Sequence, residues 1–396
     1  MWDPAHLRDK LMDPKTLVDL GSQPLVNNLC ETQEDSLRAS QYKLCAKIDD
    51  DLAIELDTII DSDVLYKNYL YSSGVSMPYV QHCRRMWHKL KHLKHDVIID
   101  IGGNDGTLLK AFQSQTTEKL RCINVDASES FREQNEEGGI EYINAFFGPD
   151  VDVPKADLII STNVFQHTPQ AGKFVEGIAK HLDGGTWILE FPYTLHTIKT
   201  LQYDQFYHEH FYYWLVTPLE KLFADHGLKI YHAEEVDIHG GSMRLWITNS
   251  DVHAQTNAHQ KYIEQEKAID WDEHRSKIIK KIYADRQFMA TLDGTTAFFG
   301  AAAKGCVFLN AISYNTDIHP HSYVVDDTPA KQGKFVPGTG LPIRTREFLF
   351  EHQPDNVVIL AHNFRDFIIK SLRPKYKGRI ITMFPDIMID EAQDHL

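Results

Sequence analysis

The stretch Tyr207–Trp214, YHEHFYYW, places two histidines and a glutamate among aromatic residues. A packed core does not require such a run, so these residues are candidates for chemistry. One candidate is a metal site. On a strand, His208 and His210 would face the same side, and His239 of DIHGGSMR could approach as a third ligand. The other interpretation of these histidines is that they are solvated or packed.

A second candidate chemistry for the same stretch is proton transfer. A histidine within reach of a carbon acid can remove a proton, because imidazole titrates near neutral pH. Glu209 or Tyr207 would then tune that histidine. The residue types alone favour neither chemistry.

A glycine turn lies upstream, in DIGGNDG at 100–106. It stands where an apolar run meets a helix pattern, so the backbone at Gly102 and Gly103 could pass close to a ligand. Asp126 follows about one strand later, where an acidic residue accepts hydrogen bonds from ribose hydroxyls. The spacing of these glycines with Gly106, directly after Asp100, is similar to the first motif of S-adenosylmethionine-dependent methyltransferases. The alternative is a turn without a ligand.

A second glycine turn, FFGAAAKGC, contains Lys304 between Gly300 and Gly305. Further on, Lys331 and Lys334 stand in a glycine- and proline-rich segment. Backbone amides and lysines together can hold a diphosphate. A loop with solvated lysines explains the same residues equally well.

Strands and helices must position these candidates, and from residue 96 they alternate. The segments DVIIDIG, CINVDAS, ADLIISTNVF and GTWILEFP are typical of buried strands, with helical stretches between them. Residues 251–290 predict connecting helices, and a second strand–helix series follows in TAFFGAAAKGCVFLNAI, SYVVDDTP and DNVVILAHNF. The pattern predicts two doubly wound α/β units. Residues 1–88 look irregular.

Composition excludes several other classes. The chain has 396 residues and a net charge of -15, with no basic stripe, which disfavours nucleic acid as a partner. No apolar run is long enough to span a bilayer, and the first residues do not resemble a signal peptide, so we expect a cytoplasmic protein without a membrane partner. The five cysteines are widely spaced, which indicates neither a disulfide scaffold nor a zinc site.

Seven segments together resemble one family. They are LGSQPLVNNL at 20–29, IGGNDGTLL at 101–109, NVFQH at 163–167, YDQFYHEHFYYW at 203–214, HGGSMR at 239–244, GAAAKG at 300–305 and KQGKFVPGTGLPI at 331–343. Their order and spacing are similar to those of the S-adenosylmethionine-dependent C-methyltransferases of nucleotide-linked deoxysugars.

The resemblance implies a three-part α/β protein and an activity. The parts would be a small N-terminal domain at 1–88, a Rossmann-like methyltransferase domain at 89–250 and a Rossmann-like nucleotide-sugar domain at 251–396. The cofactor would be S-adenosylmethionine, and the substrate a 4-keto-6-deoxysugar linked to a nucleotide, typically dTDP, methylated at C-3. The resemblance also favours a monomer.

The resemblance further implies a set of site residues. His210 would be the base, with Tyr207, Glu209, His167 and Tyr71 around the reacting sugar. The residues expected to bind the cofactor are Asp100, Gly102, Gly103, Asn104, Gly106, Asp126 and Asn163. Those expected to bind the substrate are His208, His239, Lys304, Lys331 and Lys334.

Two departures from the family pattern stand out. Relatives carry four zinc-binding cysteines in the N-terminal part, whereas this region offers only Cys30 and Cys45. We therefore expect no metal, and an N-terminal part held by packing. The segment AHNF at 361–364 has a histidine where relatives tend to have a tryptophan. Two other functions remain as alternatives: an O- or N-methyltransferase on a related sugar, and a non-catalytic protein that binds a nucleotide sugar.

Overall fold

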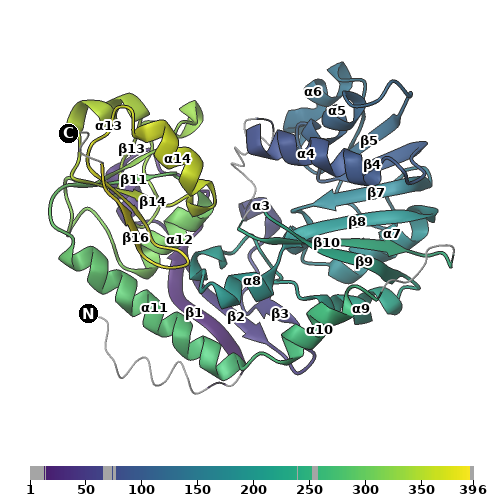
Figure 1. Ribbon diagram of the computed structural model, residues 1–396, viewed down its shortest axis with the longest axis horizontal. Coiled ribbons are helices and arrows are strands. Elements are labelled where there is room, and N and C mark those ends of the chain that lie inside the picture. The colour runs from purple at the N-terminus through teal and green to yellow at the C-terminus, as the bar shows by residue number, and fades with distance from the viewer. Residues whose placement is uncertain are drawn as a thin grey trace.

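A computed structural model describes residues 13, 15–65, 74, 77–238, 240–251 and 257–392. The expected site residues Tyr71 and His239 lie outside these ranges. Three sheets organise the described residues, and Figure 1 shows the smallest of them between the two larger α/β units. The α/β fold class expected from the sequence is confirmed.

The N-terminal part contains a three-stranded antiparallel sheet in the order β1-β2-β3. Its elements are β1 (Thr16–Pro24), α2 (Gln33–Leu37), β2 (Gln41–Ile48), β3 (Ile54–Leu56) and α3 (Ser62–Leu65). The expectation that this region is irregular was wrong. The register of β1 against β2 shifts twice, and each shift breaks the apolar alternation by which a strand is recognised in a sequence.

The central sheet has seven strands in the order β6-β5-β4-β7-β8-β10-β9. They are β4 (Val97–Ile101), β5 (Arg121–Asp126), β6 (Glu141–Asn144), β7 (Ala156–Thr162), β8 (Leu182–Pro192), β9 (Lys229–Val236) and β10 (Ser242–Thr248). The strands β6, β5, β4, β7 and β8 are parallel, and β10 is antiparallel to both of its neighbours. The strands expected from the apolar runs are present, and the parallel sheet carries an antiparallel edge.

Alternation along the strands explains how helices cover both faces of this sheet. On β4, Ile98 packs with one group of helices and Ile99 with the other, because successive side chains point to opposite faces. One face is covered by α4 (Met77–Leu90) and α5 (Thr107–Gln113). The other is covered by α7 (Ala171–His181) and α9 (Val216–Ala224). The carboxyl ends of the parallel strands therefore meet at one edge, where the predicted cofactor turn lies.

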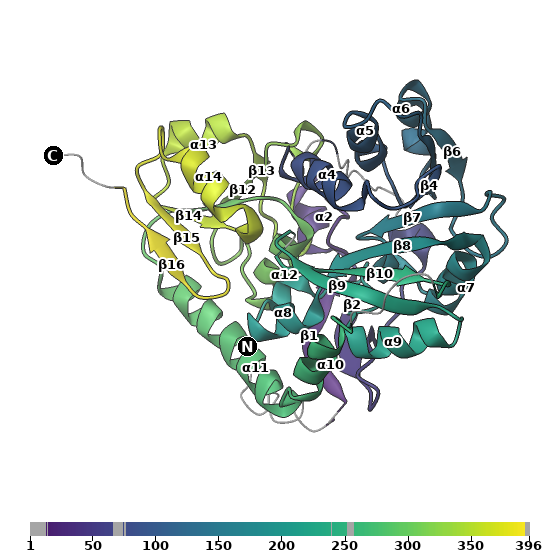
Figure 2. The same ribbon diagram turned by 45° about the vertical axis from the view of Figure 1, so that its right-hand side comes forward.

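The C-terminal sheet has six strands in the order β13-β12-β11-β14-β15-β16, parallel except for β16. The strands are β11 (Thr296–Phe299), β12 (Tyr323–Val325), β13 (Ile343–Arg344), β14 (Asn356–Ile359), β15 (Arg379–Thr382) and β16 (Met388–Asp390). Its helices are α12 (Ala303–Ala311), α13 (Arg346–His352) and α14 (Arg365–Leu372). Two connecting helices, α10 (Gln260–Lys267) and α11 (Trp271–Thr291), lead from one unit to the other, as Figure 2 shows.

The N-terminal part is joined to both larger units by main-chain hydrogen bonds. Leu56 N–H donates to the carbonyl of Phe211 at 3.0 Å, in the part of the chain that contains the central sheet. Cys30 and Phe335 exchange two hydrogen bonds, of 3.0 and 2.8 Å, with the C-terminal unit. The Ser36 hydroxyl donates to the Val336 carbonyl at 2.6 Å. The domain boundaries at 88 and 250 stay a prediction; α4 runs across the first of them.

The described residues contain neither a membrane-spanning helix nor a cluster of metal-binding side chains. In those ranges, no helix is both long and apolar enough to cross a bilayer. Within the same ranges, His, Cys, Asp and Glu side chains form no group of three that could hold a metal ion.

Candidate active site

The turn after β4 brings the backbone close to buried polar groups. Gly102 has φ +67°, and a Cβ there would lie 2.6 Å from a Val164 methyl group. A Cβ on Gly103 would lie 2.6 Å from a carboxylate oxygen of Asp100 and 2.6 Å from the side-chain oxygen of Asn124. A side chain at either position would therefore clash with these neighbouring groups unless they moved. Glycine is required at both positions by neighbouring side chains, and the close approach of this backbone to a ligand stays a prediction.

Asp100 has an unusual environment. Its side chain is 1% exposed, and neither carboxylate oxygen has a hydrogen-bond partner among the described residues. Burial, with a smaller contribution from the negative charge of Asp126, holds the pKa of Asp100 well above its usual range. A buried, unpaired carboxyl group of this kind fits a ligand that brings a cationic group, because the cation would replace the missing partners.

Asp126 and Asn163 complete the edge of the sheet. The two carboxylate oxygens of Asp126 accept the N–H groups of Asn104 at 2.9 Å and of Ser128 at 2.8 Å. These bonds orient the carboxylate and leave it lone pairs for hydroxyl donors. Asn163 has φ +54°, and its buried side-chain oxygen has no partner among the described residues.

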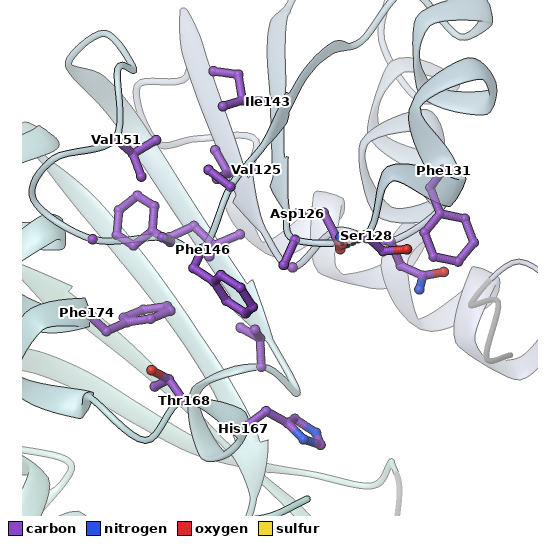
Figure 3. Close-up of a pocket in the computed structure, with 18 of the residues that line it drawn as sticks. Val125, Asp126, Ser128, Phe131, Ile143, Phe146, Val151, His167, Thr168 and Phe174 are labelled. Carbon is purple, nitrogen blue, oxygen red and sulfur yellow. Dashed lines mark hydrogen bonds between the residues drawn. The ribbon is translucent and has the colours of Figure 1, made fainter. Parts of the chain in front are cut away.

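A cavity of about 1350 Å³ begins at this turn. Figure 3 shows Asp126 and Ser128 on one side of it, Phe146 in the middle and His167 at the other end. Its wall also includes residues from the N-terminal part, Asn27 and Glu31, and Lys334 from the C-terminal unit. All three parts of the chain therefore contribute to one cavity.

Phe146 was not anticipated from the sequence. It lies in the loop after β6, lines the cavity and is 71% exposed, which is unusual for an aromatic side chain. A flat aromatic ring beside Asp126 can stack on an adenine. The usable signal was the pair of phenylalanines in NAFFGPD, directly after a strand.

We expect Phe146→Ala to weaken binding of S-adenosylhomocysteine by about tenfold, because the ring offers stacking area to a purine. Isothermal titration calorimetry measures this affinity. Phe367→Ala is the matched control, since Phe367 is 64% exposed on α14 and does not line the cavity. Equal affinities for the two variants would remove Phe146 from the cofactor site.

The histidine-rich stretch forms a cluster beside this cavity. The Tyr207 hydroxyl lies 2.6 Å from Nε2 of His210. The His210 ring centroid is 4.8 Å from that of His167, and His167 lines the cavity. Nδ1 of His167 donates to the main-chain carbonyl of Glu209 at 2.8 Å, which fixes its tautomer because a carbonyl can only accept.

The stretch is a turn, and the expectation based on strand alternation was wrong. His210 N–H donates to the Tyr207 carbonyl at 3.0 Å, which closes the turn. His208 consequently contacts the N-terminal sheet, where its Nε2 lies 3.2 Å from the Lys43 carbonyl. In this geometry His208 and His210 do not form a pair, and the metal interpretation of the stretch loses its geometric basis.

Burial lowers the pKa values of the clustered bases. The pKa of His167 falls to about 4, mainly through burial. The pKa of His210 lies well below its usual range, because of burial first and then the positive charges that His167 and Lys304 would add. Lys304, at the start of α12, has its pKa lowered to about 8 by burial. At neutral pH, His210 is therefore unprotonated and able to accept a proton.

The second glycine turn is formed as the sequence indicates. Ala301 N–H donates to Asp326 at 2.8 Å, and Lys331 Nζ donates to the Ala301 carbonyl at 2.8 Å. Lys331 therefore supports the turn. Lys334 faces the large cavity, where its Nζ lies 2.8 Å from a carboxylate oxygen of Glu31.

Comparison with known proteins gives two family matches. A family model described as "Methyltransferase domain" matches residues 79–233, and one described as "C-methyltransferase C-terminal domain" matches residues 237–385. The C-methyltransferase NovU of Streptomyces niveus is 26% identical over 415 aligned residues, which cover 96% of this chain and 95% of that protein.

Solved methyltransferase structures are also similar to about half of the chain. The 1,6-didemethyltoxoflavin-N1-methyltransferase of Burkholderia thailandensis is 14% identical, with a TM-score of 0.38, over 50% of this chain and 95% of its own. The magnesium protoporphyrin IX methyltransferase of Synechocystis is 16% identical, with a TM-score of 0.38, over 48% of this chain and 100% of its own.

The family models and the similarity to NovU define the chain as an S-adenosylmethionine-dependent methyltransferase. It is an enzyme, which sets aside the alternative of a non-catalytic binding protein. Within that class, the chain is similar to C-methyltransferases, through the family model that matches residues 237–385 and through NovU. The unpaired Asp100 carboxyl, the crowded glycine turn and the exposed Phe146 fit the cofactor.

Proposed function

We propose that this C-methyltransferase methylates C-3 of a 4-keto-6-deoxysugar linked to a nucleoside diphosphate, with His210 as the base. One observation carries the proposal: His167 lines the same cavity as Gly102, Asp126 and Asn163. The ring of His167 also packs against the ring of His210. The ring that contacts the proposed base and the cofactor turn therefore border one space, which supports carbon methylation.

Asp100 would hold the ammonium group of the cofactor's methionyl part, and Asp126 the ribose hydroxyls. When bound, S-adenosylmethionine supplies an electrophilic methyl group. The glycines of the turn allow the close approach, and Phe146 covers the purine. The protein contributes by holding the acceptor carbon and the methyl group close together and aligned, which can raise the rate by several orders of magnitude.

His210 would remove the proton at C-3, which the neighbouring C-4 ketone acidifies. The electron pair of the broken C–H bond moves into an enolate whose oxygen needs hydrogen-bond donors. Tyr207 is the donor that lies beside His210, whereas the neutral His167 ring gives its one N–H to the Glu209 carbonyl. C-3 would then take the methyl group as the methyl–sulfur bond breaks, which leaves S-adenosylhomocysteine, and the proton would remain on His210 until it is released to solvent.

The acceptor's nucleotide would lie against the C-terminal unit. Lys334 supports this because it lines the cavity from the C-terminal side and its ammonium group can bind phosphate. In the free protein that ammonium contacts Glu31, so a phosphate would replace a carboxylate. We further propose, on the family resemblance, a monomer acting in the cytoplasm.

Solvent deuterium exchange tests the carbon chemistry. In D₂O with S-adenosylhomocysteine, the enzyme should exchange the C-3 hydrogen of dTDP-4-keto-6-deoxyglucose, and proton NMR would show loss of that signal. O- or N-methylation needs no C–H cleavage, so absence of exchange with methylated product formed would establish that alternative. If dTDP binds but neither exchange nor methylated product is found, the proposed sugar is wrong.

A further inference from the structure

Asn27 joins the N-terminal part to the candidate base segment. It lies between β1 and α2, and it lines the large cavity. Its side-chain nitrogen donates to both carboxylate oxygens of Glu209, at 2.7 and 3.0 Å. These two residues are 182 positions apart in the chain, so only the folded N-terminal part brings them together.

Glu209 depends on this contact more than an exposed carboxylate would. Its side chain is 4% exposed, and the two bonds from Asn27 are the hydrogen bonds that the described structure gives its carboxylate. Burial raises the pKa of Glu209 to about 7, while the Asn27 hydrogen bond acts in the opposite direction. A buried carboxylate without its donor would favour its neutral form.

Glu209 in turn holds a member of the histidine cluster. Its main-chain carbonyl accepts the Nδ1 hydrogen of His167 at 2.8 Å. Asn27, Glu209 and His167 therefore form one connected series, from the N-terminal part to the ring that borders the cavity.

Asn27 is itself held on both sides. Leu25, two residues before it, packs against Phe211, two residues after Glu209. Cys30, three residues after it, pairs with Phe335 through two main-chain hydrogen bonds. The Asn27 side chain thus meets Glu209 from a fixed backbone, which lowers the entropic cost of the contact.

We propose that Asn27 is a positioning residue for methyl transfer, holding the Glu209 carboxylate and, through the Glu209 main chain, the His167 ring at the cavity. This inference rests on the proposed function of the same site for its consequence in catalysis. Its structural content, that Asn27 holds Glu209 as a carboxylate, can be measured without an acceptor.

The other titratable groups around Glu209 come from its own turn and from α12. His210 follows it directly, and His167 accepts no proton from solvent until well below neutral pH, since burial lowers its pKa to about 4. On α12, Glu209 is one of the charges that raise the pKa of the Cys306 thiol, and Lys304 acts on His210. Neither Cys306 nor Lys304 replaces the Asn27 donor.

The first test is a carbon-13 NMR titration of the glutamate side-chain carboxyl groups. Glu209→Gln identifies the Glu209 signal, which should have a midpoint near pH 7 in the parent enzyme. In Asn27→Ala the midpoint should rise by about one pH unit, because a charge-assisted hydrogen bond is lost. Asn28→Ala is the control, since Asn28 is the exposed neighbour of the same chemical type. An unchanged midpoint in Asn27→Ala overturns the proposal.

The second test measures catalysis on folded protein. Asn27→Ala should slow C-3 deuterium exchange of dTDP-4-keto-6-deoxyglucose by about tenfold or more, with the affinity for S-adenosylhomocysteine unchanged. Full exchange activity in Asn27→Ala would overturn the catalytic consequence. If the parent enzyme shows no exchange while the NMR midpoint still moves, the proposed substrate fails and the role of Asn27 toward Glu209 stands.

Discussion

In the variant His210→Asn, we expect the rates of C-3 deuterium exchange and of methyl transfer to a dTDP-4-keto-6-deoxysugar to fall about a thousandfold. An amide cannot take up the C-3 proton, whereas the His210 imidazole is unprotonated at neutral pH because burial lowers its pKa. Asparagine is also shorter than histidine, so it should fit beside Tyr207 without disturbing the turn. Exchange followed by proton NMR and product formation followed by mass spectrometry measure the loss.

Two controls separate chemistry from misfolding. S-adenosylhomocysteine should bind His210→Asn as it binds the parent, because the cofactor turn lies on different elements. His88→Asn, an exposed position on α4, should keep full activity. Retained turnover in His210→Asn would show that another group removes the proton, and His167 would be the next residue to replace, since it borders the cavity.

The variant Asp100→Asn is expected to bind S-adenosylhomocysteine about a hundredfold more weakly, a loss of about 3 kcal/mol. The ligand's ammonium group would lose the carboxylate that the structure leaves without other partners. Calorimetry measures this affinity. Asp96→Asn, at the exposed position just before the same strand, is the control and should bind normally.

The same carboxyl group gives cofactor binding a defined pH dependence. In the free enzyme the pKa of Asp100 is raised by burial, so the group keeps its proton to a higher pH than an exposed aspartate. A bound ammonium favours the carboxylate, so binding should release a proton and weaken as pH falls. Calorimetry in buffers of different ionisation enthalpy detects that proton. Asp100→Asn should show neither effect, and an equal proton release in the variant would assign it to another group.

Much of the fold could be predicted from the sequence, because buried parallel strands leave long apolar runs such as those before Gly102 and Asn163. These runs are local, and so are the turns that follow them. The orientation of His208 could not be predicted, because it depends on whether Tyr207–His210 is a strand or a turn. In the folded protein His208 contacts the N-terminal sheet at the Lys43 carbonyl, a partner that the local sequence does not indicate.

The part of the site that the sequence did not indicate depends on long-range contacts. Nothing in the segment around Asn27 points to Glu209, and nothing around Glu31 points to Lys334; these partners are 182 and 303 residues apart. Phe146 could not be singled out from its residue type either, because only its exposure in the folded protein indicates a role in ligand binding. Such contacts become visible only when the three sheets are assembled.

The main-chain bonds between the N-terminal part and the C-terminal unit limit how this enzyme can be recombined with its relatives. Cys30 is paired with Phe335, and the Ser36 hydroxyl bridges the Val336 carbonyl and the Gly340 N–H group. A chimaera that exchanged only the C-terminal unit would place foreign partners opposite these groups. The smallest exchangeable module is therefore discontinuous in sequence: the C-terminal unit together with the segment from Cys30 to Ser36.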